Sequence, residues 1–309
     1  LLHQVSRGSA MLDDLDLSPL LVRADPTAKV SYRPTLRNEV PDALDEQILR
    51  DGAPFFERGE KMQLDYHVRN TQRAIGTRAS SHIVRKYGMD GLAEDRLRVT
   101  LEGSCGQSLG AFGVKGLTLE VVGDANDYVG KGLSGATIII RPPSTARFAA
   151  KDNTIIGNTV LYGATSGNLF AAGQAGERFA VRNSGATVVV EGCGSNGCEY
   201  MTGGTAVILG AVGQNFGAGM TGGMAFVYDP QQRFALMANA ETILWRPVVT
   251  DHWSKVLHDL IGEHVKRTGS LQGRTILANW QLELRNFVHV VPREAVARLA
   301  APLELKAAE

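Results

Sequence analysis

The sequence lacks long apolar runs and an excess of charge of either sign. No stretch approaches the about 20 consecutive apolar residues that a membrane-spanning helix needs, so we expect no membrane partner. The 32 basic residues balance the 32 acidic ones, which argues against a nucleic-acid partner. With 44% apolar residues in a chain of 309, the composition predicts a globular protein with a sizeable core.

Cysteine is also scarce, with three residues at Cys105, Cys193 and Cys198. A low, odd count fits a reducing compartment, and no secretory signal is visible, so we expect a cytoplasmic protein. Cys193 and Cys198 could form a metal or iron–sulfur ligand pair, but their spacing matches zinc sites poorly. A tight loop with small buried thiols is the simpler expectation. The first residue is Leu1 and not methionine, from which we expect a piece of a longer polypeptide.

Glycine is abundant and unevenly distributed. Residues 101–228 hold 26 of the 35 glycines. Six of these glycines each precede a short apolar segment with the composition of a strand: Gly116, Gly135, Gly157, Gly185, Gly204 and Gly223. The segments read LTLEV, ATIII, NTVLY, ATVVV, TAVIL and MAFVY. The glycine spacings of 19, 22, 28, 19 and 19 residues indicate a repeat with two insertions.

This repeat is too short for a strand–helix–strand unit, which needs about 30 residues. The segments between the strands also lack the Asn-Gly or Asp-Gly turns of a hairpin meander. The repeat therefore predicts a mainly β fold, a right-handed parallel β-helix of about six to seven coils. The six glycines would be structural corner residues, which supply positive φ or allow close backbone approach. The third and fifth residues after each glycine are expected to face the interior.

The composition predicts three parts of the chain. Residues 1–95 would be a mixed α/β linker and cap, with helices in 41–52 and 80–87 and a strand at 62–69. Residues 96–245 would be the β-helix. Residues 246–309 would form a helical tail, in which one helix stops near Gly269 and a second begins near Leu271 and runs past Trp280.

Several motifs of the chain could in principle carry chemistry. The G-x-G-x-x-G patterns at 130–135 and 217–222 would suit a dinucleotide only if a helix followed, but a predicted strand follows each one. His252, His258 and His264 recur at steps of six, whereas ligands on one helix face sit three or four apart. We therefore expect a solvated amphipathic helix there. Its inward residues would be Trp253, Leu257, Leu260 and Ile261.

The few charges of the glycine-rich region fall into loops. Asp124, Asp127 and Lys131 are expected to make hydrogen bonds at a corner or a docking contact, and the lack of an acidic strand face argues against a carbohydrate-cleaving enzyme. A surface or interdomain ion-pair cluster is expected from the charges of the longest insertion, which are Glu177, Arg178 and Arg182. The segment 142–152 is expected to protrude.

Several long segments of the chain are distinctive. They are SCGQSLGAFGVKG (104–116), EVVGDANDYVGKGLSGATIIIRPP (120–143), NTIIGNTVLYGATSGNLFAAGQAGERFAVRNSGATVVVEG (153–192) and CEYMTGGTAVILGAVGQNFGAGMTGG (198–223). In order, they resemble the C-terminal GXGXG domain of the glutamate synthase large (alpha) subunit. The segments 69–88, 263–270 and 276–280 resemble its flanking regions. A stand-alone β-helix subunit or binding module, similar to the β-helix subunit of formylmethanofuran dehydrogenase, is the alternative.

The resemblance implies a parent oxidoreductase of the NADPH-dependent bacterial type, which makes two L-glutamate from L-glutamine and 2-oxoglutarate. It implies FMN and a 3Fe–4S cluster elsewhere in the parent chain, and FAD, a 4Fe–4S cluster and NADPH on a small (beta) subunit. The expected partners are that subunit and the amidotransferase and synthase domains of the same polypeptide. No catalytic, cofactor-binding or metal residue is carried over to this segment, which is expected to be structural and inactive alone.

Overall fold

The computed structural model describes residues 6, 8, 10–14, 16–23, 25–27 and 42–304. The chain divides into two compact units, Leu1–Pro41 and Asp42–Glu309. The described residues of the first unit form two single-turn helices, α1 (Ala10–Asp13) and α2 (Ser18–Leu21). The expected linker and cap, residues 1–95, therefore lies partly outside the described residues.

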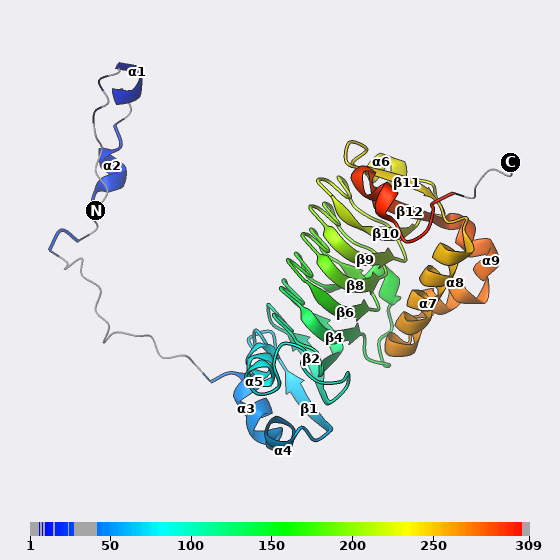
Figure 1. Cartoon of the computed structure of the whole chain (residues 1–309). Coiled ribbons are helices and arrows are strands. Elements are labelled where there is room, and N and C mark those ends of the chain that lie inside the picture. The colour runs from blue at the N-terminus through cyan, green and yellow to red at the C-terminus, as the bar shows by residue number, and fades with distance from the viewer. Residues whose placement is uncertain are drawn as a thin grey trace. The chain divides into compact units, whose positions relative to one another are not determined.

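The second unit is a mixed α/β structure built on one large, mostly parallel sheet (Figure 1). Its strands are β1 (Met62–Val68), β2 (Leu97–Cys105), β3 (Leu117–Ala125), β4 (Ser134–Arg141), β5 (Thr154–Ile156), β6 (Ser166–Ala171), β7 (Gln174–Ala175), β8 (Ser184–Val190), β9 (Thr202–Ile208), β10 (Gly222–Tyr228), β11 (Ile243–Pro247) and β12 (Phe287–Pro292). The main path of the sheet is β1-β2-β3-β4-β6-β8-β9-β10-β12-β11, and β5 pairs with β3 and β7.

Helices accompany this sheet at both ends and along one side. They are α3 (Leu44–Asp51), α4 (Ala53–Arg58), α5 (Thr77–Tyr87), α6 (Phe234–Met237), α7 (Asp251–Thr268), α8 (Leu271–Ala278) and α9 (Trp280–Glu283). In Figure 1, α3–α5 lie beside β1, and α7 runs alongside the strands. The expectation of a mainly β chain is therefore corrected to mixed α/β.

Local predictions in the flanking segments are largely confirmed. The strand at 62–69 is β1, and the helices expected within 41–52 and 80–87 are α3 and α5, which end before Gly52 and Gly88. The helical tail is confirmed only in part. Residues 287–292 form β12, which runs antiparallel between β10 and β11. This strand covers the free edge of β10, whose backbone groups would otherwise lack partners in the sheet.

The expected strand NTVLY, residues 158–162, is wrong. These residues form a turn, and Gly157 follows β5 instead of preceding a strand. The strand that pairs between β4 and β8 is β6, with Ile138 opposite Leu169 and Leu169 opposite Val188. The repeat thus has one long insertion, between β4 and β6. The apolar pattern predicted a strand here because the turn also buries apolar residues, Val160 and Leu161.

The assignment of side chains to faces is correct for the early strands and wrong for the later ones. The register shifts between Ser184 and Thr187, so that Val188 pairs with Ala206 and not with Val207. A one-residue slip moves a side chain to the opposite face of a sheet. Val207 and Phe226 therefore pack beneath α7, whereas Ala206 and Ala225 join the larger core.

A column of side chains on this second face explains where α7 lies. The paired positions run Thr100, Glu120, Ile139, Phe170, Val189, Val207 and Phe226. The column is polar at β2 and β3 and apolar from β4 to β10. Trp253, Leu257 and Ile261 of α7 pack on its apolar part. Burial of this face fixes the helix on the sheet, as the amphipathic pattern of the helix predicts.

A second set of backbone contacts joins the loops that precede the strands. We call the six loops 108–112, 128–132, 159–163, 178–182, 196–200 and 215–219 the loop ladder. In each loop the first, third and fifth residues have positive φ, whether or not they are glycine. In the second loop, for example, these residues are Tyr128, Gly130 and Gly132, with φ of 64°, 66° and 63°.

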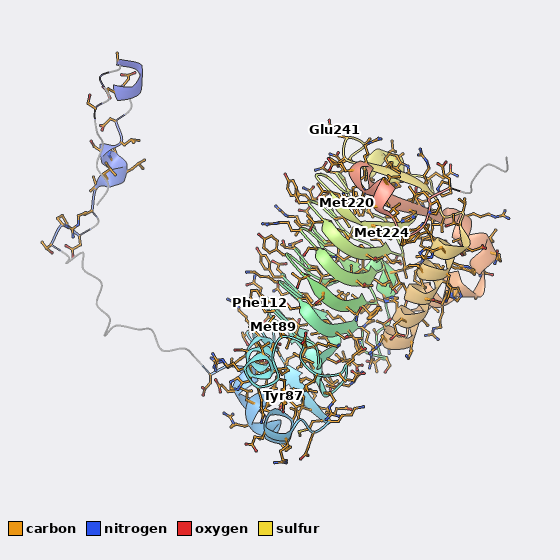
Figure 2. All side chains as sticks on the ribbon, viewed as in Figure 1. Tyr87, Met89, Phe112, Met220, Met224 and Glu241 are labelled. Atoms are coloured by element: carbon orange, nitrogen blue, oxygen red, sulfur yellow. The ribbon has the colours of Figure 1, made fainter. Side chains whose placement is uncertain are left out.

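Hydrogen bonds between neighbouring loops offset the cost of these left-handed conformations. The N–H of Tyr128 donates at 2.8 Å to the carbonyl of Asn158, the residue directly before the next loop. The N–H of Gly130 donates to Leu109 at 2.8 Å, in the preceding loop. Phe112, in the first loop, is 54% exposed and lies on the flank that faces away from α7 (Figure 2). Its ring covers Gly132, where an added Cβ would lie 2.6 Å from it.

The six glycines singled out in the sequence fall into two groups. Four have φ between +74° and +125°: Gly116, Gly135, Gly204 and Gly223. Gly157 and Gly185 are outside the left-handed region, so positive φ does not explain them. At both, an added Cβ would press against the backbone of a neighbouring segment. Their structural role stays a prediction, which the substitution Gly185→Ala tests at one of the two positions.

Candidate functional site: a cavity beside a buried glutamate

A carboxylate is buried where β8 ends. Glu191 directly follows the apolar residues of β8 and is 2% exposed. Burying a charged group is costly unless other groups pair with it. The groups that surround Glu191 on the helical side of the sheet therefore decide whether its burial is compensated.

Two residues from the helical tail meet this carboxylate. Ser270 donates a hydrogen bond from its Oγ to Oε1 of Glu191. The same hydroxyl caps α8 by accepting the N–H of Gly273 at 2.9 Å. His264 of α7 is fully buried, and its Nε2 lies 3.7 Å from Oε1 of Glu191. These contacts tie the α7–α8 connection to the end of β8.

Glu191, His264 and Ser270 are the residue types of a hydrolytic triad, but their geometry differs. A triad places the histidine between the hydroxyl and the carboxylate. Here Ser270 bonds directly to Glu191, and in the described part of the structure neither ring nitrogen of His264 makes a hydrogen bond. Ser270 is 2% exposed, and its hydroxyl is already engaged as a helix cap. The cluster therefore has no activated nucleophile.

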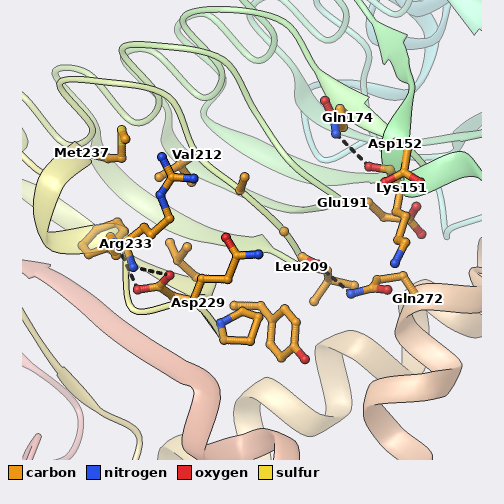
Figure 3. Close-up of a pocket in the computed structure, with 17 residues that line it drawn as sticks. Lys151, Asp152, Gln174, Glu191, Leu209, Val212, Asp229, Arg233, Met237 and Gln272 are labelled. Atoms are coloured by element: carbon orange, nitrogen blue, oxygen red, sulfur yellow. Dashed lines mark hydrogen bonds between the residues drawn. The ribbon is translucent and has the colours of Figure 1, made fainter.

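Beside this cluster lies a cavity of 410 Å³. It is bounded by Gln174 of β7, by the end of β10, by the segments that follow β8, β9 and β10, and by residues from 151–152, α6 and α8. Figure 3 shows Lys151, Glu191 and Gln272 at one end of the cavity, and Asp229 and Arg233 at the other.

The polar groups at the two ends differ in how far they are already satisfied. Asp229 accepts the backbone N–H groups of Arg233 and Phe234 at 2.8 Å each, so it stabilises the start of α6. At the other end, Oε2 of Glu191 is buried and has no hydrogen-bond partner among the described residues. Lys151 makes no ion pair within the described part of the chain. The open hydrogen-bonding capacity is therefore at the Glu191 end.

Sequence reasoning did not select Glu191, Ser270 or Gln272. One signal was present, because Glu191 is a lone charge directly after the apolar run ATVVV in a region with few charges. Nothing local to residue 191 indicated that Ser270 and Gln272 would lie beside it.

The histidines of α7 do not come together. The inward residues expected for this helix are confirmed, since Trp253, Leu257 and Ile261 are buried and Leu260 packs against them. His264 was expected to be solvated and is fully buried. Within the described ranges, no cluster of three or more histidine, cysteine or acidic residues has the arrangement of a metal site.

The three cysteines are free and buried, so the expected loop with small buried thiols is confirmed. Burial raises the pKa of the Cys105 and Cys193 thiols to about 12 and raises that of Cys198 well above its usual value. Thiols in this state are poor nucleophiles and poor metal ligands.

The loop charges are placed partly as expected. Asp127 accepts the N–H of Asn158 at 2.8 Å, and Asp124 accepts the hydroxyl of Ser104, which confirms corner hydrogen bonding. Arg178 pairs at 3.2 Å with Glu199 and not with Glu177.

Arg182 stacks at 5.6 Å over the ring of Tyr162 and donates to its hydroxyl at 3.1 Å. Most residues of the segment 142–152 are exposed, and its Lys151 and Asp152 line the cavity.

A family model described as the GXGXG motif matches residues 45–293. The chain belongs to the GXGXG motif family. The matched range contains all six loops of the loop ladder. Within the described ranges, no helix of this GXGXG chain is long and apolar enough to cross a membrane.

Curated relatives of the GXGXG chain are glutamate synthases. The chain is 62% identical over 307 residues to the "Glutamate synthase [NADPH] large chain" of Azospirillum brasilense, across 99% of this chain and 20% of that relative. It is 45% identical to the "Glutamate synthase [NADH]" of Schizosaccharomyces pombe, across 92% of this chain and 14% of that relative. The "Ferredoxin-dependent glutamate synthase, chloroplastic" of Spinacia oleracea is 43% identical, across 90% and 17%. The chain thus spans at most about a fifth of the length of these three relatives.

Proposed function

We propose that this chain is the C-terminal GXGXG region of a glutamate synthase large chain and acts there as a structural domain. The observation that carries the proposal is the 62% identity across 99% of the chain to a relative of which it covers 20%. The parent enzyme would make two L-glutamate from L-glutamine and 2-oxoglutarate. FMN and the 3Fe–4S cluster would be bound by other parts of the large chain.

The proposed role is to hold the amidotransferase and synthase domains at a fixed spacing. Two backbone ladders support it, because the sheet and the loop ladder both restrain each repeat against its neighbours. Stiffness of this kind suits a spacer between two active sites. The cavity and the buried cluster contain no activated nucleophile, which is in keeping with a structural role.

We also propose that the stacked strands wind as a right-handed parallel β-helix of about six to seven coils. Two observations support this architecture. From β1 to β10, the strands of the main path pair in parallel and in chain order. A second, short column of paired residues joins Ala125, Ile156 and Ala175. The proposed parts are a linker and cap at 1–95, the β-helix at 96–245 and a tail at 246–309.

The electron donor is proposed to be NADPH, supplied through a small (beta) subunit with FAD and a 4Fe–4S cluster. The support is the 62% identity to the NADPH-named relative of Azospirillum brasilense, although the NADPH-named relative of Bacillus subtilis is 42% identical and the NADH-named one 45%. Three free, buried thiols suit a reducing compartment, which favours a cytoplasmic location.

The first test is to read the gene upstream of Leu1. We expect coding sequence for a barrel domain and an amidotransferase domain in the same frame. A start codon and promoter directly before Leu1 would contradict the proposal and favour the alternative, a stand-alone subunit or binding module.

The second test deletes one repeat, Gly204–Gly222, in the complete large chain. We expect glutamine hydrolysis and ammonia-dependent glutamate synthesis to be retained, and glutamine-dependent synthesis to fall, because the spacing changes. The matched control is Gly262→Ala, which leaves the spacing unchanged. Full glutamine-dependent synthesis by the deletion variant would refute the spacer role.

A further inference from the structure

A groove of 630 Å³ lies between α3 and α5, the helices beside β1 (Figure 1). Three arginines line it: Arg50 of α3, and Arg78 and Arg85 of α5. Leu49 of α3 is half-buried and adds an apolar surface. Among the described residues that line the groove, Glu46 is the one acidic residue. The groove therefore carries a net positive charge.

Helical spacing gathers these cations on the outer face of α5. Arg78, His82 and Arg85 follow one another at steps of four and three residues, so they share one face of the helix. The opposite face buries Ala79 and Ile83. The sequence of α5, TRASSHIVRKY, contains no acidic residue. No pair within the helix can therefore neutralise its cations.

A buried carboxylate holds the two helices together. Asp45 of α3 is 2% exposed and accepts the N–H of Gly76 at 2.7 Å and those of Arg78 and Ala79 at 2.6 and 3.1 Å. These bonds satisfy N–H groups at the start of α5 that have no partner within the helix. The groove is therefore formed before any ligand arrives, which lowers the cost of binding.

The three arginines differ in how far their charge is compensated. Arg78 makes an ion pair with Glu46. Arg50 and Arg85 are exposed, and neither makes an ion pair within the part of the chain that the structure describes. Two guanidinium groups of the groove are therefore open to an anion.

The spacing of the cations favours an extended anion over a compact one. Arg78 and Arg85 are seven residues apart, which is about 10 Å along a helix, and Arg50 belongs to the other helix. One phosphate or carboxylate cannot pair with all three. A polypeptide segment with several carboxylates can, because a guanidinium group binds a carboxylate through paired hydrogen bonds. Leu49 would contact an apolar side chain of such a segment.

We propose that this groove docks an acidic segment from another part of the longer polypeptide. Charge complementarity determines the chemistry of the segment. Its source follows from length, since the chain spans 20% of the Azospirillum brasilense relative and most of that polypeptide lies outside it. The source rests on the proposed function and deepens it, because a docked segment would fix α3 and α5 against a neighbouring part of the enzyme.

The first experiment titrates the 309-residue chain with the peptide acetyl-EELEELEE-amide in a calorimeter. At about 20 mM salt we expect saturable binding with a Kd below about 1 mM, which weakens as salt is raised. Arg50→Gln and Arg85→Gln should each weaken binding about threefold, and the double variant about tenfold, because single exposed ion pairs are modest. Arg147→Gln is the matched control, since Arg147 is exposed and does not line the groove.

Two further probes separate charge and shape. The basic peptide acetyl-KKLKKLKK-amide should not bind, and pyrophosphate should bind at least about tenfold more weakly than the acidic peptide. The proposal is wrong if either probe binds as tightly as the acidic peptide, or if that peptide does not saturate up to about 10 mM. It is also wrong if Arg147→Gln loses as much affinity as Arg85→Gln. Should a groove variant melt at a lower temperature, Arg85→Lys decides, because it keeps the charge and must keep the binding.

The second experiment tests the source of the segment by modifying arginines with phenylglyoxal and locating the products by mass spectrometry. Arg50 and Arg85 should react in the 309-residue chain and at least about tenfold more slowly in the complete large chain, where the docked segment covers them. Equal rates in both chains would exclude a docked segment of the same polypeptide. The peptide titration does not depend on what the gene encodes upstream of Leu1, so its failure overturns the groove and leaves the proposed function standing.

Discussion

Replacing Gly185 with alanine tests whether close backbone approach, and not positive φ, requires glycine in the sheet. An added Cβ would lie 2.9 Å from the carbonyl carbon of Thr165 and closer still to its oxygen. Carbon atoms in favourable contact stand about 3.5–4.0 Å apart. The obstacle is backbone, so it cannot be relieved by a rotamer change.

The cost follows from what must move. Overpacking a well-packed site costs about 1–3 kcal/mol. A shift of Gly185 also disturbs the buried Asn183 amide, which accepts the N–H groups of Gly185 and Ala186 at 3.2 and 2.9 Å. Each such hydrogen bond contributes about 1 kcal/mol. We expect a loss of about 3 kcal/mol, which corresponds to a fall in Tm of about 6–12 °C.

Gly262→Ala is the matched control for this substitution. Gly262 lies in α7, and an added Cβ would have no heavy atom within 4 Å. Alanine should therefore stabilise the helix by about 1 kcal/mol. Both variants can be melted as the full chain and followed by circular dichroism. If Gly185→Ala melted at the wild-type temperature or above, the close-approach argument would be refuted.

Further predictions concern a buried histidine, the thiols, a helix cap and a corner glycine. Burial lowers the pKa of His289 from 6.5 to about 4, so the unfolded state binds its proton first as pH falls. Up to about 3 kcal/mol of stability should be lost between pH 6.5 and 4, and urea titrations of His289→Phe should show a flatter profile there. The free, buried thiols should react with a thiol reagent only after denaturation, and rapid labelling of the native chain would contradict their burial. Ser270→Ala should lower stability by about 2 kcal/mol, since it removes a helix cap and a partner of Glu191. Gly204→Val should lower Tm clearly, because φ there is +82°, and an unchanged melting curve would exclude a corner role.

Some parts of the structure were predictable because they depend on local pattern. The apolar residues of α7 recur at helical spacing, and the alternation in β1 follows strand geometry. The 19-residue glycine register identified β3, β4, β8, β9 and β10. The same reasoning failed where the structure depends on contacts between residues far apart in the chain. The apolar residues of 158–162 look like a strand but belong to a turn of the loop ladder.

The sequence alone determined that this is a repeat of short parallel strands with buried, free thiols, because periodicity and composition are local properties. Only the tertiary structure decided the register shift at Ser184 and Thr187, which turns Val207 and Phe226 toward α7. It also decided the site, since Glu191 lies far along the chain from His264 and Ser270. Their meeting depends on where α7 packs, and that depends on which face of the sheet is apolar after the shift. A one-residue change in pairing reverses that face, and no local sequence signal records it.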